Sequence, residues 1–337
     1  MVLGQVNPDQ PIVVAGAGAI GCFVGGLLAA RGHPVTLLGR PRILDHIRSH
    51  GLSLTDFDGL DRVVRAADVT LSEDPTCLAD ARIILVCVKT GDTATVAQAI
   101  ASHAAPTATI LSLQNGMEAV QVLRQYLPQF DLRAGMVPFN VVPKALGCYH
   151  RATSGGIVIE AGPKDIGKHL GSPDLAFAET CQIEAVQWGK LLINLNNALN
   201  ALSGLTLQAQ LLCRPWRCIM AAQMAEALRV LKAHGISPAS TTPLPADLIP
   251  WVLRLPTPLF SRVAAKMLTI DPTARTSMSY DLEAGKATEI DALQGAIIDM
   301  GAQKAVPTPI CTRVSRRIKQ ARDAGQGLPD LMPSDLS

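Results

Sequence analysis

The sequence predicts an α/β N-terminal domain built on a doubly wound parallel sheet, followed by an all-helical C-terminal domain. Short apolar runs, the first at 12–15, alternate with helical stretches, which is typical of a parallel sheet covered on both faces. A glycine-rich turn follows the first run, and from Trp188 onward the pattern is mostly helical. We expect the domains at residues 1–185 and 186–325. The segment 326–337 lacks hydrophobic periodicity, so we expect it to be a disordered tail.

The first strand and the turn after it carry a dinucleotide-binding fingerprint. Ile12-Val-Val-Ala leads into Gly16-x-Gly18-x-x-Gly21, and a helical stretch follows. The first glycine permits the tight turn, the second lets backbone N–H groups approach a pyrophosphate, and the third lets the helix pack on the strand. The helix N-terminus adds partial positive charge. We therefore predict cofactor contacts at this turn, from Gly16, Gly18, Ala19, Ile20 and Gly21.

A membrane-spanning helix is the alternative for the uncharged stretch 11–30. Its five glycines and its β-branched opening argue against that alternative. No basic segment precedes the stretch, which argues against a signal peptide.

The end of the second strand indicates which nicotinamide cofactor binds. The strand at 34–38 ends at Gly39-Arg40, where folds that prefer NAD usually carry a carboxylate for the ribose 2′-hydroxyl. A guanidinium pairs instead with a 2′-phosphate. Arg40 therefore predicts NADP(H), although a solvated loop arginine is the alternative.

Two polar residues follow the next two strands. Lys89 comes after the apolar run 83–88, and Asn115 follows the run 109–113. Ligands of doubly wound sheets bind beyond the carboxyl ends of the strands, so we expect both side chains to face the cofactor. A solvated lysine at a helix start and a turn-forming asparagine are the alternatives.

The helical half contains a lysine beside several asparagines. In a helix beginning at Lys190, Asn194 and Asn197 share the lysine's face, and Asn200 lies at its margin. Asparagine is a poor helix former, so this cluster suggests a site, with a polar helix–helix seam as the alternative. A second cluster, Ser277, Asp281, Thr288 and Glu289, is spaced to converge on a pocket, with helix capping as its alternative.

Composition excludes several classes of function. The 337 residues carry a net charge of +2 with 17% charged residues, which indicates neither a nucleic-acid surface nor an acidic partner. Histidine and cysteine show no metal-ligand spacing, so we expect no metal. The eight cysteines are scattered, as reduced thiols are in a cytoplasmic protein.

The ordered set of motifs resembles the ketopantoate reductase (2-dehydropantoate 2-reductase) family over roughly residues 11–320. The resemblance rests on the glycine fingerprint, Arg40, Val-Cys-Val-Lys89, Gln-Asn115-Gly-Met, Trp-x-Lys190-Leu-x-x-Asn194 and Thr-Ser277-x-x-x-Asp281-x-x-x-Gly-x-x-Thr-Glu289-x-Asp291. It implies an N-terminal Rossmann domain, a helical second domain and an active site between them. The implied reaction is NADPH-dependent reduction of 2-dehydropantoate to (R)-pantoate, a step of pantothenate and coenzyme A biosynthesis.

The resemblance also implies roles for individual residues. Lys190 matches the catalytic lysine that donates a proton to the C2 ketone, and Glu289 matches a glutamate near the cofactor and that lysine. Cofactor contacts are implied at Lys89, Asn115 and, by count, Val141. Substrate contacts are implied at Asn194 and Ser277, in a pocket where we also expect Asp281.

The substrate pocket departs from the family pattern at one position, and a later polar contact of the family has no clear match near Gln208. The family often has a second asparagine where this chain has Ala198, and Asn197 or Asn200 could replace it. The departure lies in the substrate pocket, so a reductase of another small 2-oxoacid is the first alternative. A non-catalytic NADP-sensing regulator is the second. A homodimer is left open as the assembly.

Overall fold

The computed structural model describes residues 11–240, 244–268 and 271–336. The chain divides into two compact units, Met1–Ile183 and Glu184–Ser337, and each is described by itself. Within the described residues, no helix combines the length and apolar character needed to cross a membrane.

The first unit is built on an eight-stranded sheet. Six parallel strands lie in the order β5 (Thr70–Ser72), β2 (Val35–Leu38), β1 (Ile12–Ala15), β6 (Ile83–Val86), β7 (Thr109–Ser112) and β8 (Asp131–Met136). Two further strands extend the β8 edge, β11 (Ile157–Glu160), antiparallel to β8, and β12 (Phe177–Thr180). The strand order runs outward from β1 in both directions, which confirms the predicted doubly wound sheet.

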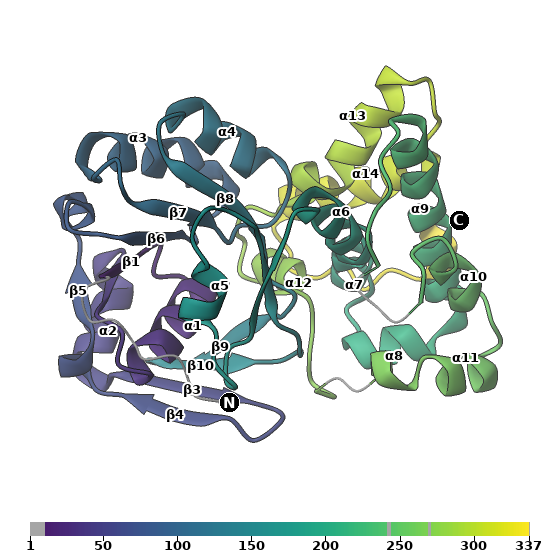
Figure 1. Cartoon of the computed structure of the whole chain (residues 1–337). Coiled ribbons are helices and arrows are strands. Elements are labelled where there is room, and N and C mark those ends of the chain that lie inside the picture. Colours follow the sequence, from purple (N-terminus) through teal and green to yellow (C-terminus); the bar gives the residue numbers. More distant parts are fainter. Residues whose placement is uncertain (1–10, 241–243, 269–270, 337) are drawn as a thin grey trace. The chain divides into compact units, whose positions relative to one another are not determined.

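Helices cover both faces of this sheet (Figure 1). The side chains of β1 alternate between two apolar cores, because successive strand residues point to opposite faces. One core contains Ile12 and Val14 with residues of α1 (Ala19–Ala30) and α2 (Pro41–His50). The other contains Val13 and Ala15 with residues of α3 (Thr93–His103) and α4 (Glu118–Tyr126).

A second sheet packs against α1. Its strand order is β4 (Asp61–Val64), β3 (Leu52–Asp56), β10 (Cys148–Arg151) and β9 (Val141–Ala145). The helix approaches it closely, since a Cβ added to Gly26 would lie 2.8 Å from Leu54 Cδ1. Parallel pairing of β3 with β10 joins segments far apart in the sequence, so a local pattern does not reveal this sheet.

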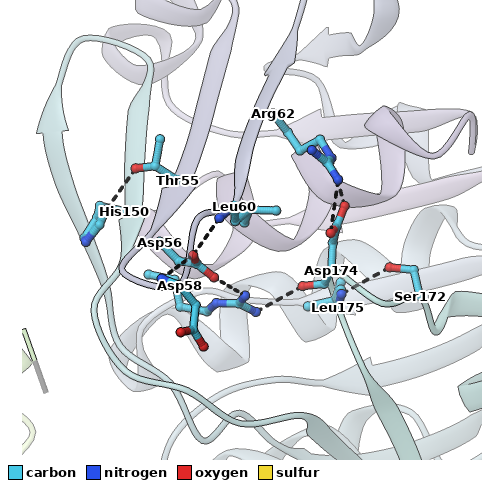
Figure 2. Close-up of polar contacts among 10 residues, drawn as sticks. Thr55, Asp56, Asp58, Leu60, Arg62, His150, Ser172, Asp174 and Leu175 are labelled. Atoms are coloured by element: carbon cyan, nitrogen blue, oxygen red, sulfur yellow. Dashed lines mark hydrogen bonds and ion pairs between the residues drawn. The ribbon is translucent and has the colours of Figure 1, made fainter. Parts of the chain in front are cut away.

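Hydrogen bonds and ion pairs join the second sheet to its loops (Figure 2). The Asp56 carboxylate accepts from the backbone N–H groups of Asp58 and Leu60, both at 2.8 Å, and from Arg151. Arg151 also donates to the Asp174 carbonyl at 3.0 Å, while the Asp174 carboxylate pairs with Arg62. The Asp56–Arg151 pair is largely buried, and its remaining hydrogen bonds satisfy the polar groups that burial would otherwise leave unpaired. The short helix α5 (Ile166–Leu170) completes the unit.

The second unit is helical, as predicted. Its helices are α6 (Ile183–Asn194), α7 (Asn196–Ser203), α8 (Leu207–Leu212), α9 (Arg214–Ala233), α10 (Ile249–Leu253), α11 (Thr257–Val263), α12 (Ser277–Glu283), α13 (Ala296–Gln303) and α14 (Pro309–Ala324). The long helix α9 packs against α8, α10, α13 and α14. Its buried Arg217 donates to the carbonyls of Leu211, Leu253 and Leu255, which ties the α10 region to α9.

The segment after Gly325 differs from the expected disordered tail. Residues 333–336 form a 3₁₀ turn, and Leu336 is fully buried. The Leu331 N–H donates to Leu202 O at 2.8 Å, and Arg313 donates to Leu336 O at 2.7 Å. Two leucines and hydrogen bonds to distant helices hold this segment, and such contacts leave no periodicity in the sequence. Residues 1–10 and Ser337, which the predicted domain ranges include, lie outside the described residues.

Candidate functional site

The glycine turn lies between β1 and α1, and its three glycines serve different purposes. Gly16 has φ +114°, a conformation that favours glycine, and an added Cβ would lie 2.7 Å from Val88 N. A Cβ on Gly21 would lie 2.1 Å from Gly16 O. The internal packing of the unit therefore explains both residues.

Gly18 has no such internal explanation. Its φ of −88° suits any residue, and an added Cβ meets no heavy atom within 4 Å among the described residues. The α1 N-terminus that follows has no side-chain cap in the described structure and no acidic residue in its first turn. Backbone N–H groups in the first turn of a helix lack intrahelical acceptors. The open space at Gly18 and these donors, at Ala19, Ile20 and Gly21, fit a dinucleotide pyrophosphate.

The carboxyl ends of the four central strands lie level. In the parallel register Ala15 is opposite both Leu38 and Val86, and Val86 is opposite Ser112. The residues that follow these strands therefore reach the same edge of the sheet as the glycine turn. This edge carries Arg40, Lys89 and Asn115, as the sequence predicted.

Gln114 holds two of these strand ends together. Its side-chain amide donates to Val88 O at 3.1 Å and to Thr93 Oγ1 at 2.8 Å, and its carbonyl oxygen accepts from Ser112 Oγ at 3.3 Å. Gln114 is buried. It therefore supports the loops that present Lys89 and Asn115, a role the sequence did not indicate because its partner loop lies about one strand and one helix away.

Arg40 lies at the surface where β2 joins α2. Its guanidinium pairs with Asp92 at 3.1 Å, and the two side chains are 83% and 52% exposed. A pair so exposed contributes little to stability, so Arg40 can exchange this partner for an anionic ligand at small cost.

Val141 belongs to a different sheet from the strands that flank the glycine turn. It begins β9 in the second sheet, opposite Arg151, and packs partly buried against the apolar core around α1. Its expected cofactor contact therefore rests on the family resemblance and on no feature of this sheet.

In the second unit, the helix expected to run through 190–200 is broken. α6 ends at Asn194 and α7 begins at Asn196, so Lys190 and Asn194 lie on one helix and Asn197 on the next. The buried side-chain amides of Gln223 and Gln294 donate to the carbonyl of the intervening Leu195, at 2.9 and 2.8 Å. Side chains that enter a helix's hydrogen-bond ladder commonly bend it, which gives the break a physical cause.

Lys190 sits in a partly buried position on α6. Its exposure is intermediate, and loss of contact with solvent is what perturbs its ammonium group. Burial lowers the pKa of the Lys190 ammonium to about 8. Because burial disfavours the charged form, this ammonium is a stronger acid than an ordinary lysine.

Asn200 is a structural residue. It is fully buried, and its side-chain NH₂ donates to Leu205 O at 3.0 Å and to Gln210 Oε1 at 3.1 Å. Its carbonyl oxygen accepts from Thr276 N at 3.0 Å and from Ser279 Oγ at 2.9 Å. All four hydrogen-bonding positions of the amide are occupied, so its expected substrate contact is withdrawn.

The same contacts bring α12 onto α7. Thr276, which precedes α12, also donates from its hydroxyl to Asn197 O at 3.1 Å. Ser277 is the first residue of α12 and is half-buried, and Asp281 lies one turn further on. The structure thus brings Ser277 beside the helix that carries Asn197.

Glu289 lies just before a π-helical turn at Asp291–Gly295, where the Ala296 N–H donates to Asp291 O. The same turn carries Gln294, which contacts Leu195 beside Asn194. The preceding Thr288 has a buried hydroxyl without a hydrogen-bond partner among the described residues. The sequence did not predict the roles of Gln210, Gln223 and Gln294, because no residue spacing marks a glutamine that will be buried.

The described part of the chain contains no group of three or more His, Cys, Asp or Glu side chains arranged to hold a metal ion.

Comparisons with known proteins agree with this organisation. Residues 12–164 match the family model described as Ketopantoate reductase PanE/ApbA, and residues 182–322 match Ketopantoate reductase PanE/ApbA C terminal. A 2-dehydropantoate 2-reductase of Halobacterium salinarum is 28% identical over 93% of this chain and 99% of that protein.

Solved structures show the same fold. A PanE/ApbA family ketopantoate reductase from Ralstonia eutropha has a TM-score of 0.79 and 28% identity, covering 94% of this chain and all of that chain. A D-mandelate dehydrogenase solved with NADH and anilino(oxo)acetate has a TM-score of 0.76 at 18% identity, covering 94% of this chain and 99% of that chain.

Proposed function

Because the chain belongs to the ketopantoate reductase PanE/ApbA family, we propose that it reduces 2-dehydropantoate to (R)-pantoate with NADPH. It is an oxidoreductase of that family. The observation that carries the reductase chemistry is the partly buried Lys190, whose pKa is lowered to about 8, on the helix that also carries Asn194, and the substrate is taken from the family match. The proposal places the reaction in the cytoplasm, as a step of pantothenate and coenzyme A biosynthesis.

Lys190 acts as the proton donor. Negative charge develops on the C2 oxygen of a 2-oxoacid as the ketone is reduced, and a positioned ammonium stabilises that charge and then protonates the oxygen. A pKa near 8 keeps most of the lysine protonated at neutral pH and makes transfer of its proton less costly than from an ordinary lysine. The nicotinamide ring, when bound, supplies the hydride to the carbonyl carbon.

The residues of the first unit hold the cofactor. The Gly18–Gly21 backbone takes the pyrophosphate, in the open space that an alanine at Gly18 would enter. Arg40 takes the ribose 2′-phosphate in place of its exposed partner Asp92, which is the basis for NADPH over NADH. Lys89 and Asn115, at neighbouring strand ends, contact the nicotinamide half.

The residues of the second unit hold the substrate. Ser277 binds the carboxylate, Asn194 binds the hydroxyl or the ketone oxygen, and Asp281 lines the same pocket. With Asn200 occupied by structural hydrogen bonds, Asn197 is the asparagine that takes the role of the missing family residue. Glu289 takes the role that the family resemblance implies for it, beside the lysine and the cofactor.

A reductase of another small 2-oxoacid is the second candidate, and one observation favours it. Position 198, where the family often carries an asparagine, is an alanine in this chain and offers no polar side chain. A pocket with one amide fewer tolerates a less hydroxylated substrate. A non-catalytic NADP-sensing regulator is the third candidate, and a sensor has no use for an acidic lysine.

Steady-state rates with NADPH distinguish these candidates. We expect kcat/KM for 2-dehydropantoate to exceed that for unbranched and aryl 2-oxoacids. A higher value for one of the other acids supports the second candidate, and NADPH binding without turnover of any acid supports the third. A homodimer stays a prediction, which light scattering on the eluting peak of a sizing column checks.

A further inference from the structure

The break between α6 and α7 is held by a buried pair of glutamines. Gln223 on α9 and Gln294 in the π-helical turn each donate from Nε2 to the Leu195 carbonyl, at 2.9 and 2.8 Å. Gln294 Nε2 also lies 3.2 Å from Gln223 Oε1, so the two side chains are joined to each other. Both glutamines are fully buried, and Leu195 is 1% exposed.

These contacts are specific rather than incidental. A buried amide donor left unpaired costs about 1–3 kcal/mol, and both Nε2 groups and Gln223 Oε1 are paired here, while Gln294 Oε1 has no hydrogen-bond partner among the described residues. Here two separate elements supply amides that meet at one carbonyl oxygen, although each could have been an apolar residue in a helical core. The π-helical turn contributes as well, since the extra residue in that turn changes which side chain faces α7.

The carbonyl that both glutamines contact lies between candidate site residues in the chain. Asn194 immediately precedes Leu195, Lys190 lies about one turn earlier on α6, and Asn197 follows on α7. Gln294 itself lies five residues after Glu289, in the element that begins beside it. One carbonyl at the junction of the two asparagine-bearing helices, at a residue with helical dihedrals (φ −54°, ψ −27°), therefore accepts from both glutamines and is joined through Gln294 to the glutamate-bearing segment.

We propose that Gln223 and Gln294 are positioning residues that hold the α6–α7 break so that Lys190, Asn194 and Asn197 meet one 2-oxoacid. The proposal rests on the proposed function for the identity of that ligand. It assigns the glutamines no contact with substrate or cofactor. Their effect passes through Leu195 O.

The test uses Gln223→Met and Gln294→Met in the full chain, since methionine keeps the length of glutamine without its donors. The matched control is Glu226→Gln, in α9 one turn after Gln223. Glu226 is equally buried, but its carboxylate accepts from Ile310 N and Cys311 N at the start of α14 and does not reach Leu195. Circular dichroism and thermal unfolding first show that each variant is folded.

Two measurements then test the placement of the site residues. In the first, each methionine variant lowers kcat/KM for 2-dehydropantoate about ten- to a hundredfold, with both kcat and KM affected, because small displacements of catalytic groups have such effects. The Kd for NADPH stays within about twofold of the wild-type value. Glu226→Gln leaves kcat, KM and this Kd near wild type. In the second, the pH dependence of acylation at Lys190, followed by mass spectrometry, shifts upward in the methionine variants alone as the lysine loses its buried placement.

The outcomes separate the two proposals. A wild-type protein that turns over no 2-oxoacid refutes the proposed function, while the acylation measurement still tests the positioning role. An unchanged Lys190 profile in both methionine variants overturns the positioning role. So does a loss of kcat/KM in Glu226→Gln that equals theirs, because general destabilisation then accounts for it.

Discussion

Gly18→Ala separates the requirements of the fold from those of the cofactor. The added methyl meets no heavy atom within 4 Å among the described residues, and the φ of −88° at this position suits alanine. Alanine stiffens the unfolded chain but is a poorer N-cap than glycine, and these opposing effects leave a net change of about 1 kcal/mol or less. The same methyl occupies the space through which a pyrophosphate would approach the backbone. We expect a loss of NADPH affinity of about tenfold or more, or ~1.4 kcal/mol.

Gly21→Ala is the matched control within the same turn. Its Cβ would lie 2.1 Å from the Gly16 carbonyl oxygen, so backbone must move, at a cost of about 1–3 kcal/mol or more. Fluorescence titration with NADPH measures affinity, and thermal unfolding without cofactor measures stability. We expect Gly18→Ala to lose affinity with the melting temperature nearly unchanged, and Gly21→Ala to lose both. Wild-type affinity in a folded Gly18→Ala protein would refute the argument that open space at this glycine is reserved for a ligand.

Four further predictions concern three individual side chains. Arg40→Asp should weaken NADPH binding about tenfold or more and leave NADH binding within about twofold, because it removes the partner of the 2′-phosphate; paired titrations check this, and equal losses contradict the role. Lys190→Met should lower kcat about a hundredfold or more with little change in the Kd for NADPH, measured by steady-state kinetics and titration. In the wild type, the rate of reduction should fall as pH rises through about 8, where Lys190 loses its proton; a pH–rate profile flat from 7 to 9.5 contradicts its role as the acid. Asn200→Leu should lower the free energy of unfolding by about 2–5 kcal/mol by leaving several buried partners unpaired, as denaturant unfolding measures.

The asparagine cluster shows what helical periodicity can predict and what it cannot. Angles around a helix place Asn194 and Asn197 on the face of Lys190, and they place Asn200 at its margin. Periodicity does not say what lies opposite each residue. The fold sets Gln210, Thr276 and Ser279 against Asn200, and these contacts turn a candidate ligand into a structural residue.

The same limit explains the missed break at Leu195. The two side chains that donate to its carbonyl are 28 and 99 residues away in the sequence, and no residue of the segment 190–200 indicates them. The second sheet was missed for the same reason, since β3 finds its parallel partner in β10. The terminal segment is held by Leu202 and Arg313, which are also distant in the chain.

The sequence by itself determined the features whose causes are local. The turn at Gly16 needs a positive φ, the strand before it needs apolar residues on both faces, and the residues after each parallel strand reach one edge of the sheet. Only the tertiary structure decided which polar residues of the helical unit are occupied by other side chains and which are presented for chemistry. The physical reason is that hydrogen-bond partners decide whether a buried amide is structural or available to a ligand, and the fold brings those partners from distant parts of the chain.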